Sequence, residues 1–463
     1  MTIAAESSPP FLLSFLITIV IFSWVALGQR KKHSAADFAV AGRCFGRWHV
    51  AGAIMGTLVG GASTIGTVQM AYLYGLSGWW FTLGAGIACL FLAATLAGPL
   101  RSGEVVTLAE FIARYHGERA RVAASLFSSF GMFIHIIAQL LAGGTLLVSL
   151  FKIPQAVATF IAAGLIALVA VKGGLRRAGS VGLVKLLLLY VTMIGAGGLA
   201  LNQAGGLQNL KISLPYFPWF SLFGYGMKEC LSDMLSMIIG VVSTQIYLQA
   251  IFAAKNVHEA RQGAMIGALL IPPLGLCGVA VGMAMRLTYP GINSAEALPT
   301  FLLHSFPPLW AGVAFATLLF AAIATAAGLA IGIGTTIQTD LLGHRADSEE
   351  RRLKHLQMAT LFTVLVALLL VMTQLDSLIL HWSFLSMGIR GATLFVPLMA
   401  AVYFGRHTAR KAGAVAIVMA PIVVILSGLS GWQPAPPLYL GLAVSVTVII
   451  AGLCLERPPI NKP

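Results

Sequence analysis

The chain has 463 residues, of which 58% are hydrophobic and only 10% are charged, and its mean hydropathy is +0.90. This balance excludes a soluble globular protein and indicates a polytopic membrane protein. The formal net charge of +14 would suggest a nucleic-acid partner in a soluble protein, but its distribution among the loops gives another explanation.

Apolar stretches long enough to cross a bilayer recur along the whole chain. A membrane-spanning helix needs about 20 mostly apolar residues. By this measure the sequence predicts an all-α protein with about thirteen spans, at 11–28, 50–77, 79–99, 123–150, 155–172, 181–201, 226–249, 263–286, 309–336, 357–374, 382–404, 412–429 and 437–455. The first lacks a basic n-region and a small-residue cleavage site, so we interpret it as a true span and not as a cleaved signal.

Lysine and arginine are concentrated in alternate loops. If the N-terminus is placed outside, 23 of the 29 lysine and arginine residues lie in loops on the side of the C-terminus. The positive-inside rule then predicts an outer N-terminus and a cytoplasmic C-terminus, which an odd number of spans requires. The net charge is therefore a topology signal. It favours a multi-pass protein of the plasma (inner) membrane whose partner is the lipid bilayer, and implies no nucleic acid.

Two predicted spans, five helices apart, contain helix-breaking or hydroxyl-rich sequence. The second span carries the run from Gly60 to Thr67, and the seventh carries Ser236, Gly240, Ser243, Thr244 and Gln245. A bilayer has no water for freed backbone groups, so such sequence is tolerated only inside protein or beside a polar cavity. The two spans cross in opposite directions, as two inverted five-helix repeats require.

This pattern predicts four parts of the chain. They are an N-terminal helix and cytoplasmic loop (1–47), a first repeat (48–201), a second repeat (222–404) and two C-terminal helices (405–463).

Several short motifs occur in a specific order and spacing. They are Asp37 to Arg43; Gly60 to Thr67, with Tyr72 to Gly75 and Ser77 to Trp80; Thr107 to Ile112 with Arg114 and Tyr115; Lys172 to Arg176; and Gln249 to Lys255 with Glu259 to Arg261. Together they resemble the sodium:solute symporter family over nearly the whole chain. The resemblance implies a broken-helix fold of thirteen helices, with spans 2–6 and 7–11 as the repeats. It implies a secondary transporter that moves a small organic solute with a coupling cation by alternating access.

The resemblance also implies a sodium site between spans 2 and 9. The aligned ligands are the backbone carbonyls of Ala62 and Ile65 and the span-9 residues Ala321, Ala324 and Thr325. A hard cation prefers oxygen ligands, and an unwound helix offers its carbonyls.

Three positions depart from the family pattern near this site. Ala324 stands where the family usually has serine, Gly182 where it has an aspartate associated with sodium coupling, and Lys185 where glutamine is usual. The first two changes remove side-chain oxygens, and the third adds a cation.

Lys185 permits two interpretations. It lies only about 7 Å along its helix, so its ammonium could reach the inner interface. Alternatively, the ammonium occupies or replaces the sodium site, as a lysine on this core helix does in some proton-coupled or sodium-independent transporters of the same fold. A lysine removed from water can lose its proton near neutral pH. The coupling ion is therefore predicted to be Na⁺, the family default, or H⁺, and no other cofactor is expected.

Two further charged features lie at membrane depth. Arg390 lies near the middle of the bilayer, where it could pair with Glu229 or Asp233 or clamp a carboxylate-bearing substrate. Lys228, Glu229 and Asp233 form either a solvated outer helix end or an outer gate.

Polar and aromatic residues beside the breaks are candidates for the substrate site, since a small-solute site needs an apolar wall with a few aimed polar groups. They are Gln69, Trp80, Gln139, Ser243 and Gln245, with Arg390, Trp79 and His135 as further members. The tryptophans also suit an interfacial belt, and His135 suits a hydrogen-bonded core position.

A non-transporting membrane sensor is the alternative function, because this fold also occurs fused to signalling domains. We expect no output domain, since the chain ends eight residues after the last predicted span. No catalytic constellation or metal cluster emerges at one membrane depth, so we do not expect an enzyme or a metal beyond Na⁺. The sequence leaves the substrate and the oligomeric state open, although Arg390 favours a carboxylate-bearing solute.

Overall fold

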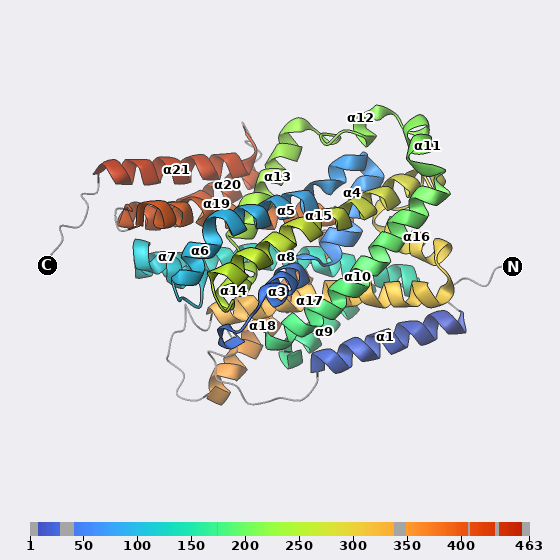
Figure 1. The fold of residues 1–463 in the computed structure, drawn as a ribbon, viewed down its shortest axis with the longest axis horizontal. Coiled ribbons are helices and arrows are strands. Elements are labelled where there is room, and N and C mark those ends of the chain that lie inside the picture. The colour runs from blue at the N-terminus through green and yellow to red at the C-terminus, as the bar shows by residue number, and fades with distance from the viewer. Residues whose placement is uncertain are drawn as a thin grey trace.

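The computed structural model describes residues 8–27, 41–173, 175–337, 349–405, 408–430 and 435–455, and these residues are almost entirely helical. Within them the only β-type pairing is an isolated bridge between Phe45 and Ala254. The all-α prediction is therefore confirmed for this part of the chain (Figure 1).

The elements follow one another without a large inserted domain. In chain order they are α1 (Pro9–Leu27), η2 (Ala41–Arg43), α3 (Arg47–Leu58), η3 (Ala62–Gly66), α4 (Thr67–Tyr74), η4 (Gly75–Trp79), α5 (Trp80–Phe91), η5 (Leu92–Leu96), α6 (Ala97–Ser102), α7 (Leu108–His116), α8 (Glu118–Phe151), α9 (Gln155–Gly173), α10 (Leu175–Gln203), α11 (Gly206–Ser213), α12 (Tyr216–Trp219), α13 (Met227–Val242), α14 (Gln245–Phe252), α15 (Val257–Thr288), η6 (Ser294–Glu296), α16 (Ala297–Ser305), α17 (Pro308–Thr336), α18 (Glu349–Val371), α19 (Ile379–Phe404), α20 (Arg410–Ser430) and α21 (Pro437–Leu455).

Long apolar helices make up most of the bundle. In the part of the chain that the structure describes, nine helices are long and apolar enough to cross a membrane, and the bent pair α13 and α14 makes a tenth. Two shorter apolar helices, Pro9–Phe22 and Gln155–Val171, accompany them. One of the nine is a helical run from Ala62 to Ser102. It contains parts of the predicted spans 50–77 and 79–99, and the chain turns between them near Gly75, which has a positive φ of +65°. The total of thirteen spans stays a prediction.

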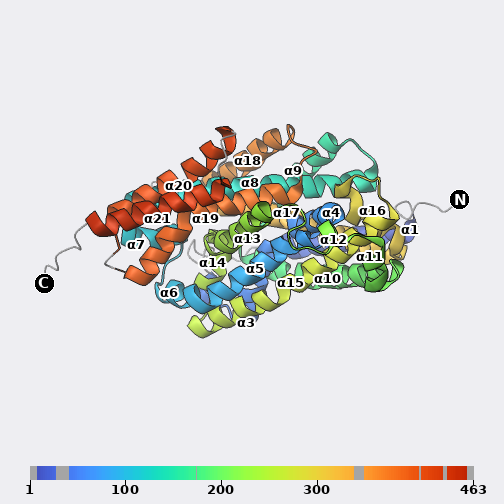
Figure 2. The same ribbon diagram turned by 90° about the horizontal axis from the view of Figure 1, so that it is seen from above.

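The long helices run between two ends of an elongated bundle (Figures 1 and 2). The short helices α6 and α7 lie at one end, and α11 and α16 lie at the other. α8 and α17 are almost wholly buried, whereas most residues of α18 and α21 are half-buried or exposed. A buried helix in the middle and apolar outer faces are what a bundle surrounded by lipid requires.

The first helix break falls inside the glycine-rich run. α3 ends at Leu58, Val59 has extended geometry, and the chain re-enters a helix through the π turn η3. The Ser63 hydroxyl accepts a hydrogen bond from the Gly60 amide (2.9 Å). This side chain replaces the carbonyl that the helix would have supplied four residues earlier.

The second helix break falls in the predicted seventh span. α13 and α14 meet at an angle of 42° across Ser243 and Thr244. The Thr244 hydroxyl donates to the Gly240 carbonyl (2.5 Å) and so satisfies a group at the end of α13. Both predicted breaks therefore occur in the structure, five predicted spans apart.

Gly240 tests how closely α13 packs against α19. A Cβ there would lie 2.6 Å from both the Cβ and the carbonyl oxygen of Met387 and 2.7 Å from its Cα. Because backbone atoms cannot move aside as a flexible side chain can, we expect Gly240→Ala to destabilise the protein by about 1–3 kcal/mol. The measurement is the thermal unfolding midpoint in detergent. Gly164→Ala is the control, since nothing lies within 4 Å of its added Cβ. Equal midpoints would contradict the close packing.

Candidate functional site

Lys185 of α10 is fully buried and makes three polar contacts between α3 and α17. Its ammonium donates to the Gly56 carbonyl (2.6 Å) and the Thr325 hydroxyl (3.0 Å), and it lies 3.5 Å from the Ala321 carbonyl. An ammonium has three N–H donors, so these three oxygens match its full capacity. The side chain therefore points into the core and does not extend to the interface.

The α3 oxygen that Lys185 binds is the Gly56 carbonyl, while the roles of Ala62 and Ile65 as sodium ligands stay predictions. The Gly60 amide would bond the Gly56 carbonyl if the helix continued, but it bonds Ser63 instead. The Gly56 carbonyl is thereby released four residues before the break. The Ala62 carbonyl, in contrast, accepts the Thr67 amide within the π turn, and no contact joins Ile65 to Lys185.

Two of the three α17 residues predicted for the sodium site lie beside the Lys185 ammonium. Thr325 and Ala321 contact the Lys185 ammonium through their oxygens. Ala324 is half-buried and packs beside the stacked rings of Phe22 and Phe320. Its methyl group offers no ligand, so the site has one hydroxyl and two carbonyl oxygens.

Gln139 and His135 of α8 hold the broken helix from the other side. The Gln139 side-chain oxygen accepts from the Gly61 amide (2.9 Å), and its nitrogen lies 3.1 Å from His135 Nε2. Both side chains are fully buried. Gln139 therefore satisfies a backbone donor that the break exposes, and this role is available without any solute.

Three other substrate candidates also bind backbone groups. Gln69 accepts from the Ile379 amide at the start of α19 (3.0 Å), and Gln245 accepts from the Leu108 amide (2.6 Å). Trp80 donates to the Leu222 carbonyl (2.5 Å) and is nearly buried. Ser243 differs from these three, because its buried hydroxyl has no hydrogen-bond partner at the second break. The role of all four in substrate binding stays a prediction.

Arg390 of α19 is fully buried and is held by its own helix. Its Nε donates to the Ser386 carbonyl (3.1 Å), and its Nη2 reaches the Ser386 hydroxyl (2.7 Å) and the Met387 sulfur (3.3 Å). Nη1 has no hydrogen-bond partner. Among the described residues no ion pair joins Arg390 to Glu229 or Asp233.

Glu229 and Asp233 lie at the start of α13, toward the end of the bundle that carries α11 and α12. Glu229 is exposed, whereas Asp233 is half-buried and accepts from the Tyr225 hydroxyl (3.0 Å). Burial and the Asp233 carboxylate raise the pKa of Tyr225, so its phenol remains a donor at neutral pH. The Tyr225 ring also contacts the Tyr74 ring, with centroids 5.6 Å apart.

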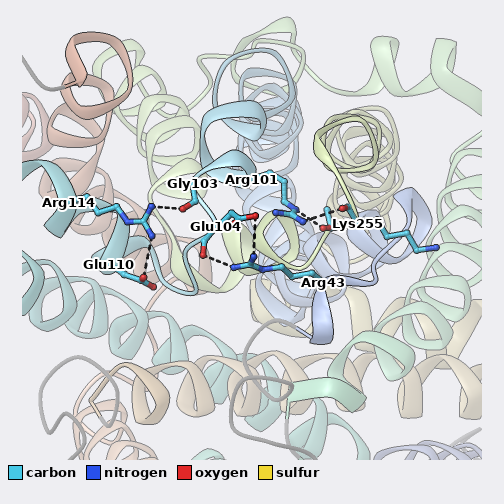
Figure 3. A network of polar contacts seen from close by, with 8 residues as sticks. Arg43, Arg101, Gly103, Glu104, Glu110, Arg114 and Lys255 are labelled. Carbon is cyan, nitrogen blue, oxygen red and sulfur yellow. Dashed lines mark hydrogen bonds and ion pairs between the residues drawn. The ribbon is translucent and has the colours of Figure 1, made fainter.

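At the opposite end of the bundle, a polar network joins three segments distant in sequence (Figure 3). Its hydrogen bonds run from Arg43 to the Glu104 carbonyl (2.6 Å), from Arg101 to the Ala254 and Lys255 carbonyls (2.6 and 3.2 Å), and from Arg114 to the Gly103 carbonyl (2.5 Å). Arg43 and Glu104 also form an ion pair of 3.9 Å. The network ties the segment before α3 to the loop before α7 and to the turn after α14. Sequence reasoning did not find it, because the partners are mostly backbone carbonyls.

Comparisons with known proteins show which proteins this chain resembles in sequence and fold. The model of the sodium:solute symporter family matches residues 38–420. A monocarboxylic acid transporter of Corynebacterium glutamicum is 25% identical over 78% of this chain and 73% of its own length. A sodium/pantothenate symporter of Escherichia coli is 26% identical over 94% of each chain. A solved Na⁺-coupled sialic acid symporter superimposes with a TM-score of 0.80 at 17% identity, over 97% of this chain and 98% of its own.

Gln139→Leu tests the link between α8 and the first break. The substitution leaves the buried Gly61 amide and His135 Nε2 without partners, which costs about 1–3 kcal/mol. We expect a clearly lower thermal unfolding midpoint in detergent. Gln203→Leu is the control, because Gln203 pairs only with Ser305 at an exposed position. A Gln139 variant as stable as this control would contradict the assigned role.

Proposed function

Because this chain belongs to the sodium:solute symporter family, we propose that it is a symporter in which the Lys185 ammonium takes the place of the sodium ion between α3 and α17. The chain is a multi-pass plasma-membrane protein and a solute transporter, not an enzyme. The proposed coupling ion is the proton on Lys185, and transport does not need Na⁺.

The position of the Lys185 ammonium carries this proposal. It binds one carbonyl released by the broken helix and the hydroxyl of Thr325, which are the kinds of oxygen that a sodium ion would use. A cation placed on the same oxygens would lie a few ångströms from the ammonium, and like charges at that distance repel strongly away from water. When Lys185 loses its proton, its bonds to α3 and α17 weaken, which links proton release to movement of the broken helix.

The proposed solute is a small organic molecule with a carboxylate. The relatives are described as carriers of monocarboxylic acids, pantothenate and sialic acid, and each of these solutes bears a carboxylate. The buried and unpaired Arg390 supports the same solute class, because a guanidinium binds a carboxylate through two parallel hydrogen bonds.

We also propose the orientation and the repeats that the sequence predicts. The N-terminus lies outside and the C-terminus lies in the cytoplasm, with inverted repeats over 48–201 and 222–404. The grouping of α6 and α7 at one end and of α11 and α16 at the other supports this orientation, because the loops at the first end are rich in arginine (Figures 1 and 2).

Uptake into vesicles tests the coupling ion. Purified protein in liposomes should accumulate a labelled monocarboxylate or pantothenate when the outside is acidic, equally in sodium-free potassium or choline buffer. Collapse of the pH gradient with a protonophore should abolish accumulation. Protein-free liposomes give the background. Strict dependence on Na⁺ would overturn the proposal.

A designed sodium site tests the role of Lys185. The double substitution Lys185→Gln and Ala324→Ser removes the ammonium and restores the serine that is usual in the family. We expect NaCl to raise the thermal unfolding midpoint of this variant relative to equal KCl, because ligand binding stabilises the folded state. The wild type and Ala324→Ser alone should not distinguish the two salts. A sodium-specific rise in the wild type would show that the site still takes Na⁺.

A further inference from the structure

The core of the bundle contains a second buried cation whose charge is not balanced. Arg390 is fully buried, and three of its hydrogen bonds go to Ser386 and Met387 of its own helix. These bonds fix the guanidinium but leave its charge, since a carbonyl, a hydroxyl and a thioether are all neutral. A buried charge without a partner of opposite sign is costly and indicates a function.

The acidic residues that could balance this charge are placed elsewhere. Asp233 binds Tyr225, and Glu229 is exposed at the helix end. Ion pairs among the described residues include Arg43 with Glu104, Arg114 with Glu110 and Arg121 with Glu118, which involve exposed or half-exposed side chains. Arg390 therefore has a free positive charge that no described side chain neutralises.

Two other unsatisfied polar groups lie beside Arg390. The Tyr247 hydroxyl of α14 lies within side-chain hydrogen-bonding reach of the guanidinium. His135 lies one helical turn after Gly131, which packs against the aliphatic part of Arg390. Tyr247 and His135 are both fully buried. Arg390 Nη1, Tyr247 Oη and His135 Nδ1 make no hydrogen bond of good geometry. Unsatisfied buried polar atoms are rare in folded proteins, so three in one neighbourhood require an explanation.

We propose that Arg390, Tyr247 and His135 form a binding station for a carboxylate between α8, α14 and α19. Nη1 of Arg390 supplies the charge and one donor, and the Tyr247 hydroxyl supplies a second donor. His135 contributes through Nδ1 when this nitrogen carries the proton. A carboxylate accepts such converging donors and neutralises the guanidinium. This inference rests on the proposed transport function, in which the carboxylate belongs to the solute.

The station is connected to the first helix break. His135 pairs with Gln139, which in turn holds the Gly61 amide. Gly131 of α8 allows the aliphatic part of Arg390 to lie against its backbone, because a Cβ there would come 2.4 Å from Arg390 Cγ. A substitution at Gly131 therefore displaces the guanidinium while it preserves the charge.

Anion binding to the purified full-length protein tests the station without any transport assay. The thermal unfolding midpoint is followed in sodium-free buffer during titration with potassium acetate, and separately with potassium chloride at matched ionic strength. We expect a saturable rise with acetate in the wild type. Arg390→Gln should raise the half-saturating acetate concentration at least roughly tenfold, and Tyr247→Phe should raise it roughly fivefold. Arg119→Gln, an equal change of charge at an exposed position, should match the wild type.

The remaining variants cover the case in which Arg390→Gln does not fold, and the titration with chloride tests whether the site is specific for a carboxylate. If Arg390→Gln does not fold, Tyr247→Phe and Gly131→Ala carry the test, and both should weaken the acetate response. A saturable rise with chloride alone would overturn the assignment to a carboxylate. The absence of a saturable rise in the wild type, or an unchanged response in Arg390→Gln and Tyr247→Phe, would overturn the station itself. Since every arm omits Na⁺ and measures binding, these failures leave the sodium-independent uptake to be judged separately.

Discussion

The release of backbone groups at the first helix break is the constraint on which the centre of this protein depends. In a bilayer core these groups have no water to bond, so each needs a partner within the protein. The Gly60 amide takes the Ser63 hydroxyl, the Gly61 amide takes Gln139, and the Gly56 carbonyl takes Lys185. Three side chains from three elements are therefore positioned by one interruption of a helix.

This constraint explains why several polar residues near the breaks already bond backbone groups. Gln69, Gln139 and Gln245 each accept from a backbone amide. A polar side chain at membrane depth can satisfy the backbone or bind a ligand, and each bond to the backbone leaves it fewer donors and acceptors for a ligand. Ser243, Tyr247, Arg390 and His135 retain unsatisfied atoms, and they come from the second break and from α14, α19 and α8.

The sequence predicted the fold and part of the site for reasons that the structure makes clear. Helix breaks follow from local glycine and hydroxyl content, and both occur where that content is high. Lys185 was identifiable because it replaces a glutamine within a family pattern while Ala324 and Gly182 lose oxygens. Ala62 and Ile65 stay predictions as sodium ligands, whereas the carbonyl that Lys185 binds follows from another rule, that a break releases the carbonyl four residues before it. Applied to Gly60, that rule gives Gly56. Arg390 was recognised as unusual, but its neighbours Tyr247 and His135 come from distant helices and depend on tertiary packing.

The two breaks contact different parts of the protein: the first contacts buried polar groups of the core, and the second contacts the polar network at one end of the bundle. The first break leads through Gln139 and His135 toward Arg390, and through Gly56 to Lys185 and α17. The second break begins α14 with Gln245, which bonds the Leu108 amide at the start of α7 and the Val106 carbonyl (3.3 Å). The loop before α7 belongs to the polar network with Arg43, Arg101 and Arg114 (Figure 3).

A change of angle between α13 and α14 must therefore either carry α7 with it or break these bonds. Polar contacts of this kind exchange with water at the membrane surface at little net cost, whereas those of Lys185 in the core do not. In the proposed mechanism the larger barrier to movement therefore lies at the cation site, where gain or loss of the Lys185 proton would change it.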